Sequence, residues 1–110
     1  VPQDKFLNCV IRIETVLNPQ QLLETLHEIE AHAKRTREVH WGPRTLDLDI
    51  LFYDHVTVNT PQLTIPHADM HNRSFVLEPL NEIASWYQHP VLHKTVQQLL
   101  DQLVKDDDWL

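Results

Sequence analysis

The chain has 110 residues, of which 42% are hydrophobic and 23% are charged, the balance of one small folded domain. Nine Lys and Arg against sixteen Asp and Glu give a net charge of −7, which argues against a general binder of nucleic acid or anionic membranes. The sequence has no run of roughly 18 to 20 apolar residues and no signal-peptide pattern among its first residues, so we expect a cytoplasmic protein with no membrane partner. The single cysteine, Cys9, excludes an internal disulfide and, within an apolar run, is expected in the core.

The first third of the sequence predicts a strand and then a helix. Apolar and polar residues alternate over residues 6–16 with the two-residue period of a half-buried strand. Asn18, Pro19 and Gln21 form a helix start, with an N-cap, a proline at the first helical position and a glutamine three residues after the cap. Leucines at helical spacing follow, which predicts an amphipathic helix to about residue 33.

The rest of the chain predicts a loop, a hairpin and two helices. The basic stretch 34–44 has neither period and ends in Trp-Gly-Pro, which indicates a loop. Residues 45–53 predict a strand that turns back at Asp54 into a short second strand, and a short helix follows around residues 75–84, interrupted or restarted at its proline. A capping box at Thr95 opens the last helix, before an acidic tail.

Two carboxylates in the 45–53 strand are candidate metal ligands. Asp47 and Asp49 are two residues apart, so on a strand they share a face, with their bases roughly 6.5 to 7 Å apart. Two carboxylates at this spacing suit one or two Mg²⁺ ions. Taken alone, however, alternating Asp residues more often mark the solvent face of an edge strand.

The basic residues near this pair are candidate phosphate ligands. In the stretch 34–44, four basic residues against one glutamate leave a charge of +3 in an otherwise acidic chain. Gly42 is the only glycine, so no glycine-rich phosphate loop is present and side chains must hold any phosphate. Guanidinium groups together with Mg²⁺ fit phosphoryl transfer, although a solvated loop and surface residues are the alternative. The candidates are Arg35, Arg37, Arg44, His67 and Arg73.

These motifs resemble a known enzyme family. The run Trp41-Gly42-Pro43-Arg44-Thr45-Leu46-Asp47-Leu48-Asp49-Ile50-Leu51 is similar to the signature of the 6-hydroxymethyl-7,8-dihydropterin pyrophosphokinases, which transfer a pyrophosphoryl group from ATP to a pterin alcohol and release AMP. Further matches follow in the family's order: Pro2-Gln3-Asp4, Phe6-Leu7-Asn8, Ile29-Glu30, Arg35-Thr36-Arg37, Pro66-His67, Asn72-Arg73 and Phe75-Val76-Leu77.

The resemblance implies an α+β, ferredoxin-like fold, with helices packed on an antiparallel sheet. It covers essentially the whole chain, residues 1–110, as a single domain. The family's usual N-terminal portion has no counterpart here, so the opening strand and helix are expected to be missing from this fold. An exposed sheet edge would follow, and with it self-association.

The resemblance also implies a role for each matching residue. Asp47 and Asp49 would bind two Mg²⁺ ions, and Arg35 and Arg44 would act on the phosphates of ATP. The nucleotide side would comprise Glu30, Arg37, Trp41, Ile50, His67 and Arg73. The pterin would lie between the rings of Phe6 and Phe75 and hydrogen-bond to Asn8. A flat heterocycle stacks on aromatic rings, and the asparagine amide can both donate and accept hydrogen bonds.

Three positions depart from the family pattern. His40 stands where the family usually has Arg, Lys34 where it has Gly, and His27 where it often has Gln. We expect His40 to weaken one phosphate contact or make it dependent on pH, because histidine is only partly charged near neutrality.

Two other classes of function stay open from the sequence. A binding module would keep the aromatic residues and arginines and hold nucleotide or pterin without turnover. A small metal-binding interaction domain is less well supported, because His67 and His71, a histidine pair at helical spacing, have no convincing third ligand.

Overall fold

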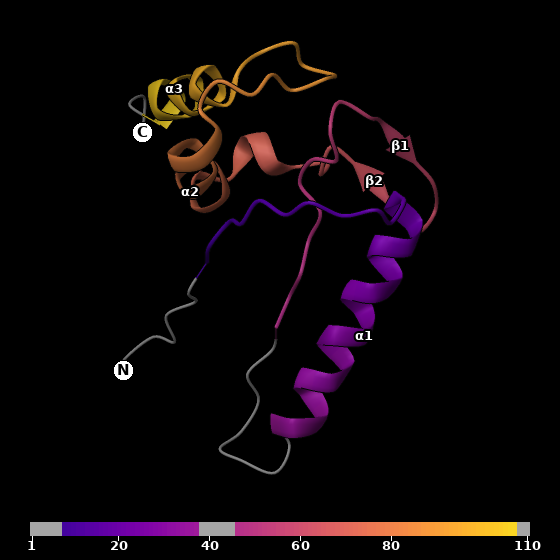
Figure 1. Ribbon diagram of the computed structural model, residues 1–110. Helices are drawn as coiled ribbons and strands as arrows, with labels where there is room; N and C mark the ends of the chain where they lie inside the picture. The colour runs from indigo at the N-terminus through magenta and orange to yellow at the C-terminus, as the bar shows by residue number, and fades with distance from the viewer. Residues whose placement is uncertain (1–7, 38–45, 108–110) are drawn as a thin grey trace, which may run out of the picture. The chain divides into compact units, whose positions relative to one another are not determined.

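The computed structural model describes residues 8–37 and 46–107 and has an α+β architecture (Figure 1). Its elements are α1 (Pro19–Arg37), β1 (Val58–Asn59), β2 (Thr64–Ile65), the 3₁₀ helix η1 (Met70–Asn72), α2 (Ser74–Ala84) and α3 (Val96–Asp107). The chain forms two compact units: a central unit, Thr15–His67, and a terminal unit, Val1–Glu14 with Ala68–Leu110. No helix in the described part of the chain is long and apolar enough to cross a membrane.

Helix α1 starts where the sequence predicts and ends later. Asn18 Oδ1 accepts the Gln21 N–H at 2.9 Å, and Gln21 Oε1 accepts the Asn18 N–H at 3.0 Å, which completes the predicted capping box. The helix continues through residues 34–37, so the prediction that the basic loop starts at residue 34 is wrong. Lys and Arg are good helix formers, and the helix needs no apolar stripe where it is exposed. Residues 38–45, the rest of that predicted loop, lie outside the described residues.

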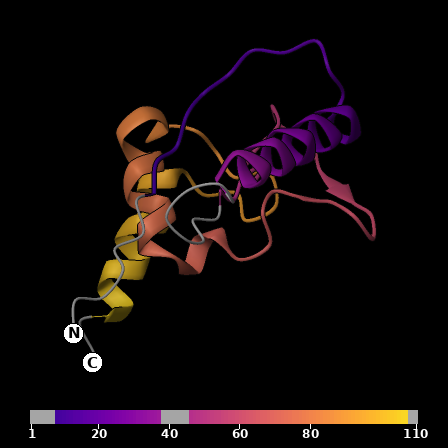
Figure 2. The same ribbon diagram turned by 90° about the horizontal axis from the view of Figure 1, so that it is seen from below.

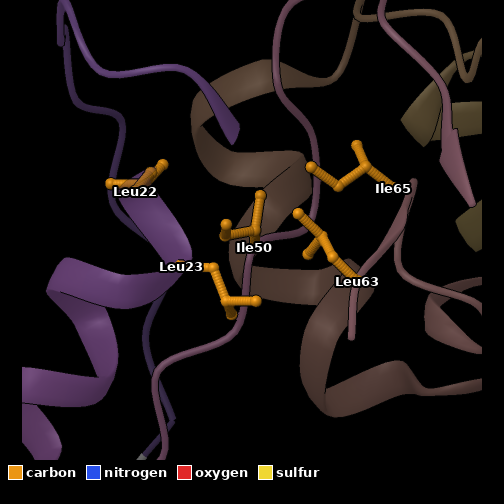
Figure 3. Packing of buried hydrophobic residues seen from close by; sticks show 5 residues of the cluster. All are labelled: Leu22, Leu23, Ile50, Leu63 and Ile65. Atoms are coloured by element: carbon orange, nitrogen blue, oxygen red, sulfur yellow. The ribbon is translucent and has the colours of Figure 1, made fainter. Parts of the chain in front are cut away.

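The core of the central unit joins α1 to the segments that follow it. Ile50 lies between leucines of α1 on one side and residues of the β1–β2 hairpin on the other (Figure 3). The five buried residues of this cluster are Leu22, Leu23, Ile50, Leu63 and Ile65. The Tyr53 hydroxyl also donates a hydrogen bond to the carbonyl of Leu17, just before α1. The segment 46–53 is therefore fixed to α1 by apolar and polar contacts together.

The strand pairing differs from the prediction. The turn at Asp54 is confirmed by a hydrogen bond from the Val56 N–H to the Tyr53 carbonyl, 3.1 Å. Residues 46–53 belong to no strand, however, and β1 pairs antiparallel with β2, with Val58 opposite Ile65. A strand needs hydrogen bonds to a neighbouring strand. The second turn, in which the Thr60 N–H donates to the Leu63 carbonyl at 2.9 Å, places β2 and not residues 46–53 beside β1.

The predicted half-buried strand over residues 6–16 is wrong where the structure describes it. Residues 8–16 belong to no strand, and the Ile11 and Ile13 side chains are 76% and 53% exposed. Cys9 is exposed and does not lie in the core as expected. An alternating pattern becomes a half-buried strand only when a paired strand and a covering layer are present, and the described residues supply neither to this segment.

The terminal unit packs α2 against α3 and η1 (Figures 1 and 2). Its buried apolar side chains are Met70, Leu77, Leu80, Val96 and Leu99. Helix α2 runs through Pro79, so the predicted interruption at this proline is wrong: a proline removes one backbone hydrogen bond from a helix, and the remaining bonds and the buried Leu77 and Leu80 keep α2 together. Helix α3 begins with the predicted capping box, in which the Thr95 N–H donates to Gln98 Oε1 at 2.8 Å. Both predicted helices of this part of the chain are therefore present.

Candidate active site

The two candidate metal ligands lie on the solvent side of the segment 46–53. Asp47 and Asp49 are exposed, whereas Leu48 is half-buried and Ile50 is 9% exposed. The alternation that the sequence predicts is therefore present over residues 47–50, although no strand ladder holds it. Because the Ile50 side chain is part of the core cluster, it anchors the segment and offers a nucleotide little surface of its own.

Glu30 of α1 holds the backbone between the two aspartates. Its Oε2 accepts the Leu48 N–H at 2.7 Å, across 18 residues of sequence. A carboxylate that accepts a backbone N–H at this distance makes one of the stronger hydrogen bonds found in proteins. Arg35 is exposed on the same helix, five residues further along. The sequence predicted Glu30 as a nucleotide contact and gave no sign that it would bind this backbone.

His67 is connected to the same segment. Its N–H donates to the Leu51 carbonyl at 3.0 Å, directly after the cis bond between Ile65 and Pro66, and its side chain is half-buried. The central unit thus connects the helix that carries Glu30 and Arg35, the segment that carries the aspartates and the end of the hairpin that carries His67.

The donor set of the aspartate pair fits Mg²⁺ better than zinc. In the part of the chain that the structure describes, no three His, Cys, Asp or Glu side chains form a group that could hold a metal ion. Mg²⁺ commonly uses one or two carboxylates and completes its octahedral shell with water and substrate phosphates. A structural zinc site, in contrast, requires four protein ligands. Asp47 and Asp49 therefore suit a Mg²⁺ ion that is bound together with phosphates.

A second polar cluster lies in the terminal unit, where η1 meets α2. Asp69 Oδ2 accepts a hydrogen bond from Arg73 Nε at 3.3 Å, and Asp69 Oδ1 accepts one from Asn72 Nδ2 at 2.9 Å. The Arg73 guanidinium carbon also lies 5.7 Å from the centroid of the Phe75 ring, which is close enough for a cation–π contact. The hydrogen bond from Asn72, followed by that from Arg73, lowers the pKa of Asp69 and keeps this carboxylate ionised.

One residue of this cluster was missed by the sequence-based prediction. Phe75 is 49% exposed, as a ring that contacts a ligand must be. Asp69 was not among the predicted site residues. Its spacing of three and four residues from Asn72 and Arg73 was the available signal, because such residues are neighbours on a helical turn.

The remaining predicted site residues divide into two groups. Asn8 is exposed at the start of the described chain. Phe6, Trp41 and Arg44 lie outside the described residues, as do the side chain of Arg37 and the whole of His40. Their predicted roles stay predictions.

Comparison with known proteins identifies the family. The family model of the 7,8-dihydro-6-hydroxymethylpterin-pyrophosphokinases matches residues 1–85. The chain belongs to this family. The matched range contains the aspartate pair with Glu30 and His67, and also the Asp69 cluster, but it ends before α3.

Individual relatives extend the similarity. The chain is 53% identical over 81 residues to a 2-amino-4-hydroxy-6-hydroxymethyldihydropteridine pyrophosphokinase of Bacillus subtilis, which covers 74% of the chain and 48% of the relative. It is 48% identical over 106 residues to the Haemophilus influenzae protein of the same name, covering 94% of the chain and 63% of the relative. The bifunctional protein FolKE of Lactococcus lactis is 46% identical over 83 residues, or 76% of the chain and 24% of that protein. The chain therefore spans from a quarter to just under two thirds of the length of these relatives.

Proposed function

We propose that this chain carries the catalytic segment of an ATP-dependent pyrophosphokinase of folate biosynthesis, which transfers pyrophosphate from ATP to 6-hydroxymethyl-7,8-dihydropterin and releases AMP. The observation that carries the proposal is the exposed Asp47 and Asp49 pair, held by Glu30 and by the core inside the range that matches the pyrophosphokinase family. The names of the Bacillus and Haemophilus relatives agree with this activity.

In this proposal the central unit binds the phosphates. Asp47 and Asp49 hold two Mg²⁺ ions, which supply positive charge to the phosphates when bound. Arg35 and Arg44 place guanidinium groups on the phosphates, and the exposure of Arg35 on α1 is compatible with that role. The residues proposed for direct contact with the nucleotide are Arg37, Trp41, His67 and Arg73, whereas Glu30 and Ile50 contribute through the segment 46–53 that they hold.

The pterin is assigned to aromatic and amide side chains. We assign one face of its ring system to Phe75 and the other to Phe6, with Asn8 as the hydrogen-bonding residue. The half-exposed Phe75 ring supports this assignment, because a buried ring would have no face to offer. The Arg73 guanidinium lies over the same ring and donates its Nε–H to Asp69, and we assign its terminal N–H groups to a phosphate.

The proposed reaction is an in-line transfer of pyrophosphate. The hydroxymethyl oxygen of the pterin forms a bond to the β-phosphorus of ATP, while the bond from that phosphorus to the oxygen of the α-phosphate breaks and AMP leaves with this oxygen. Asp49 assists the loss of the hydroxyl proton, either by accepting it or by holding a metal ion that would lower the pKa of the hydroxyl, and the arginines stabilise the charge that develops on the phosphoryl oxygens. The protein forms no covalent intermediate, so the rate depends on positioning and charge.

Several finer features belong to the same proposal. The fold is the family's ferredoxin-like one, in which the whole chain forms a single domain. ATP and the pterin are the binding partners, without nucleic acid or a membrane, and the location is cytoplasmic. Self-association through an exposed sheet edge completes the proposal.

The test is AMP formation by the chain from Mg·ATP and the pterin alcohol, with Asp49→Asn as the decisive variant. Loss of the carboxylate is expected to lower the rate by about 100-fold or more, because it removes a general base and a metal ligand together. Asp54→Asn is the matched control: it makes the same change of charge at an exposed turn residue of the same unit, whose φ of 47° asparagine tolerates.

Each outcome of this test has a distinct meaning. Turnover in the parent and in Asp54→Asn, with loss in Asp49→Asn, supports the proposal. Equal turnover in all three chains contradicts the assigned role of the aspartate pair. No turnover in a folded parent that still binds Mg·ATP would overturn the catalytic proposal in favour of the binding module.

A further inference from the structure

The hydrogen bond between Glu30 and Leu48 joins a helix to the backbone at the centre of the aspartate pair. Glu30 Oε2 accepts the Leu48 N–H at 2.7 Å, and this amide belongs to the peptide bond between Asp47 and Leu48. Glu30 is half-buried on α1, so the contact is partly protected from solvent. The carboxylate thus acts on the backbone from which both aspartate side chains project.

Few other contacts fix the backbone around Asp47 and Asp49. Residues 46–53 belong to no strand, so no ladder of backbone hydrogen bonds fixes them. Ile50 anchors the segment in the core, and the Leu51 carbonyl accepts the His67 N–H at 3.0 Å. Both of these anchors lie on the C-terminal side of Asp49. Glu30 supplies the anchor on the other side, between the two aspartates.

We propose that Glu30 is a positioning residue for the Asp47 and Asp49 pair, holding the intervening backbone so that both carboxylates face away from the core. The inference deepens the proposed function and rests on it for the cation that the aspartates bind. It assigns Glu30 a role other than contact with the nucleotide. One carboxylate oxygen is committed to the Leu48 amide, and a second negative charge beside the phosphates of ATP would be repelled.

The experiment compares three variants of α1. Glu30→Ala removes the acceptor, Glu30→Gln keeps an oxygen that accepts the same N–H without the charge, and Glu28→Ala removes an exposed carboxylate from the same helix as the control. Hydrogen exchange of the Leu48 amide, measured by NMR without ligands, reports the contact itself. Binding of Mn²⁺, as a probe of the Mg²⁺ site, is then measured by calorimetry in the presence of a non-hydrolysable ATP analogue.

We expect Glu30→Ala to accelerate exchange at Leu48 and to weaken Mn²⁺ binding by about 10-fold or more, the usual effect of losing a residue that orients metal ligands. Glu30→Gln is expected to recover most of both losses, and Glu28→Ala to behave like the parent. If Glu30→Gln binds Mn²⁺ as weakly as Glu30→Ala, the charge of Glu30 acts on the ligand and positioning is refuted. If all chains bind Mn²⁺ equally, positioning also fails while the proposed function stands. If the parent binds no Mn²⁺ although Leu48 exchange responds, both proposals fail and the bond only stabilises the fold.

Discussion

The loop between α2 and α3 depends on a neutral histidine. His89 is 5% exposed, and its Nδ1 accepts the N–H groups of Val91 at 3.2 Å and of Leu92 at 3.0 Å. Because Nδ1 is an acceptor, the proton of the neutral ring must be on Nε2. A second proton would occupy Nδ1 and break both hydrogen bonds. Burial lowers the pKa of His89, and the neighbouring His71 and His93 lower it further.

This arrangement predicts that the terminal unit loses stability in mild acid. The ordinary pKa of histidine is 6.5 and the folded value is lower, so below pH 6.5 the unfolded chain binds more protons than the folded one. The contribution of His89 is therefore complete above pH 6.5 and declines as the pH falls from 6.5 toward the folded pKa. The two hydrogen bonds that protonation breaks correspond to a loss of about 1 to 3 kcal/mol, from about 0.5 to 1.5 kcal/mol each.

Two substitutions separate the acceptor from the titration. His89→Leu keeps an apolar group in the buried site but has no acceptor, so we expect it to cost about 1 to 3 kcal/mol at pH 7.5. His89→Asn is the matched variant, because asparagine accepts N–H groups two and three residues ahead in turns, and it is expected to cost less. Neither variant titrates at this position. Urea unfolding between about pH 7.5 and pH 5, followed by circular dichroism, should therefore show a weaker dependence on pH in both than in the parent.

A direct measurement distinguishes the loss of this acceptor from a general effect of acid. At a fixed pH of 7.5, the amides of Val91 and Leu92 should exchange faster in His89→Leu than in His89→Asn, because only the first leaves both donors without an acceptor. If the unfolding free energy of His89→Leu keeps the pH dependence of the parent, or if these two amides exchange equally in all three chains, the reasoning is refuted.

Three further sets of substitutions test individual contacts. Leu77→Ala empties a fully buried position of α2 and should lower the unfolding free energy by about 2 to 5 kcal/mol in urea titrations, whereas Leu77→Met should cost less than about 1.5 kcal/mol. Asn18→Ala removes the cap of α1 and should cost about 0.5 to 2 kcal/mol, whereas Asn18→Asp should retain the cap; equal stability of the two variants would contradict the capping role. Asp69→Asn removes the charge that pairs with Arg73, and it should leave the melting temperature nearly unchanged because this pair is exposed. It should raise the KM for ATP, because Asp69 orients the arginine proposed to contact the nucleotide; an unchanged KM would count against that role of Arg73.

The helices could be predicted from the sequence because their starts are set by neighbours in the chain. In both capping boxes, Asn18 with Gln21 and Thr95 with Gln98, the donor and acceptor are three residues apart. The strands could not be predicted equally well. An alternating pattern specifies which side chains share a face, but pairing depends on a partner elsewhere in the chain. Residues 47–50 accordingly keep their alternating exposure without belonging to a strand.

In the candidate site, too, features set by neighbouring residues could be predicted, whereas contacts between residues far apart in the sequence could not. The exposure of Asp47 and Asp49 could be predicted from their spacing, whereas their binding of metal ions is a proposal. The contact from Glu30 to Leu48 joins residues 18 positions apart, so no local pattern announces it. The Asp69 contact with Arg73 lies within one helical turn, where the spacing of the two residues allows it. An acidic and a basic residue four positions apart also occur on many exposed helices that bind no ligand, so this spacing alone does not identify a site.

The extension of α1 to Arg37 changes how the basic stretch can act. A loop residue must lose backbone entropy when it orders around a ligand, at a cost of about 1 to 2 kcal/mol per residue. Arg35 lies on helical backbone, so in the proposed role only its side chain would have to be ordered around a phosphate. Lys34 and Arg35 also stand near the C-terminal end of this helix, where its dipole favours positive charge, which helps to explain why the helix continues past the predicted end. The backbone that would carry Arg35 to a phosphate is therefore already ordered by the helix.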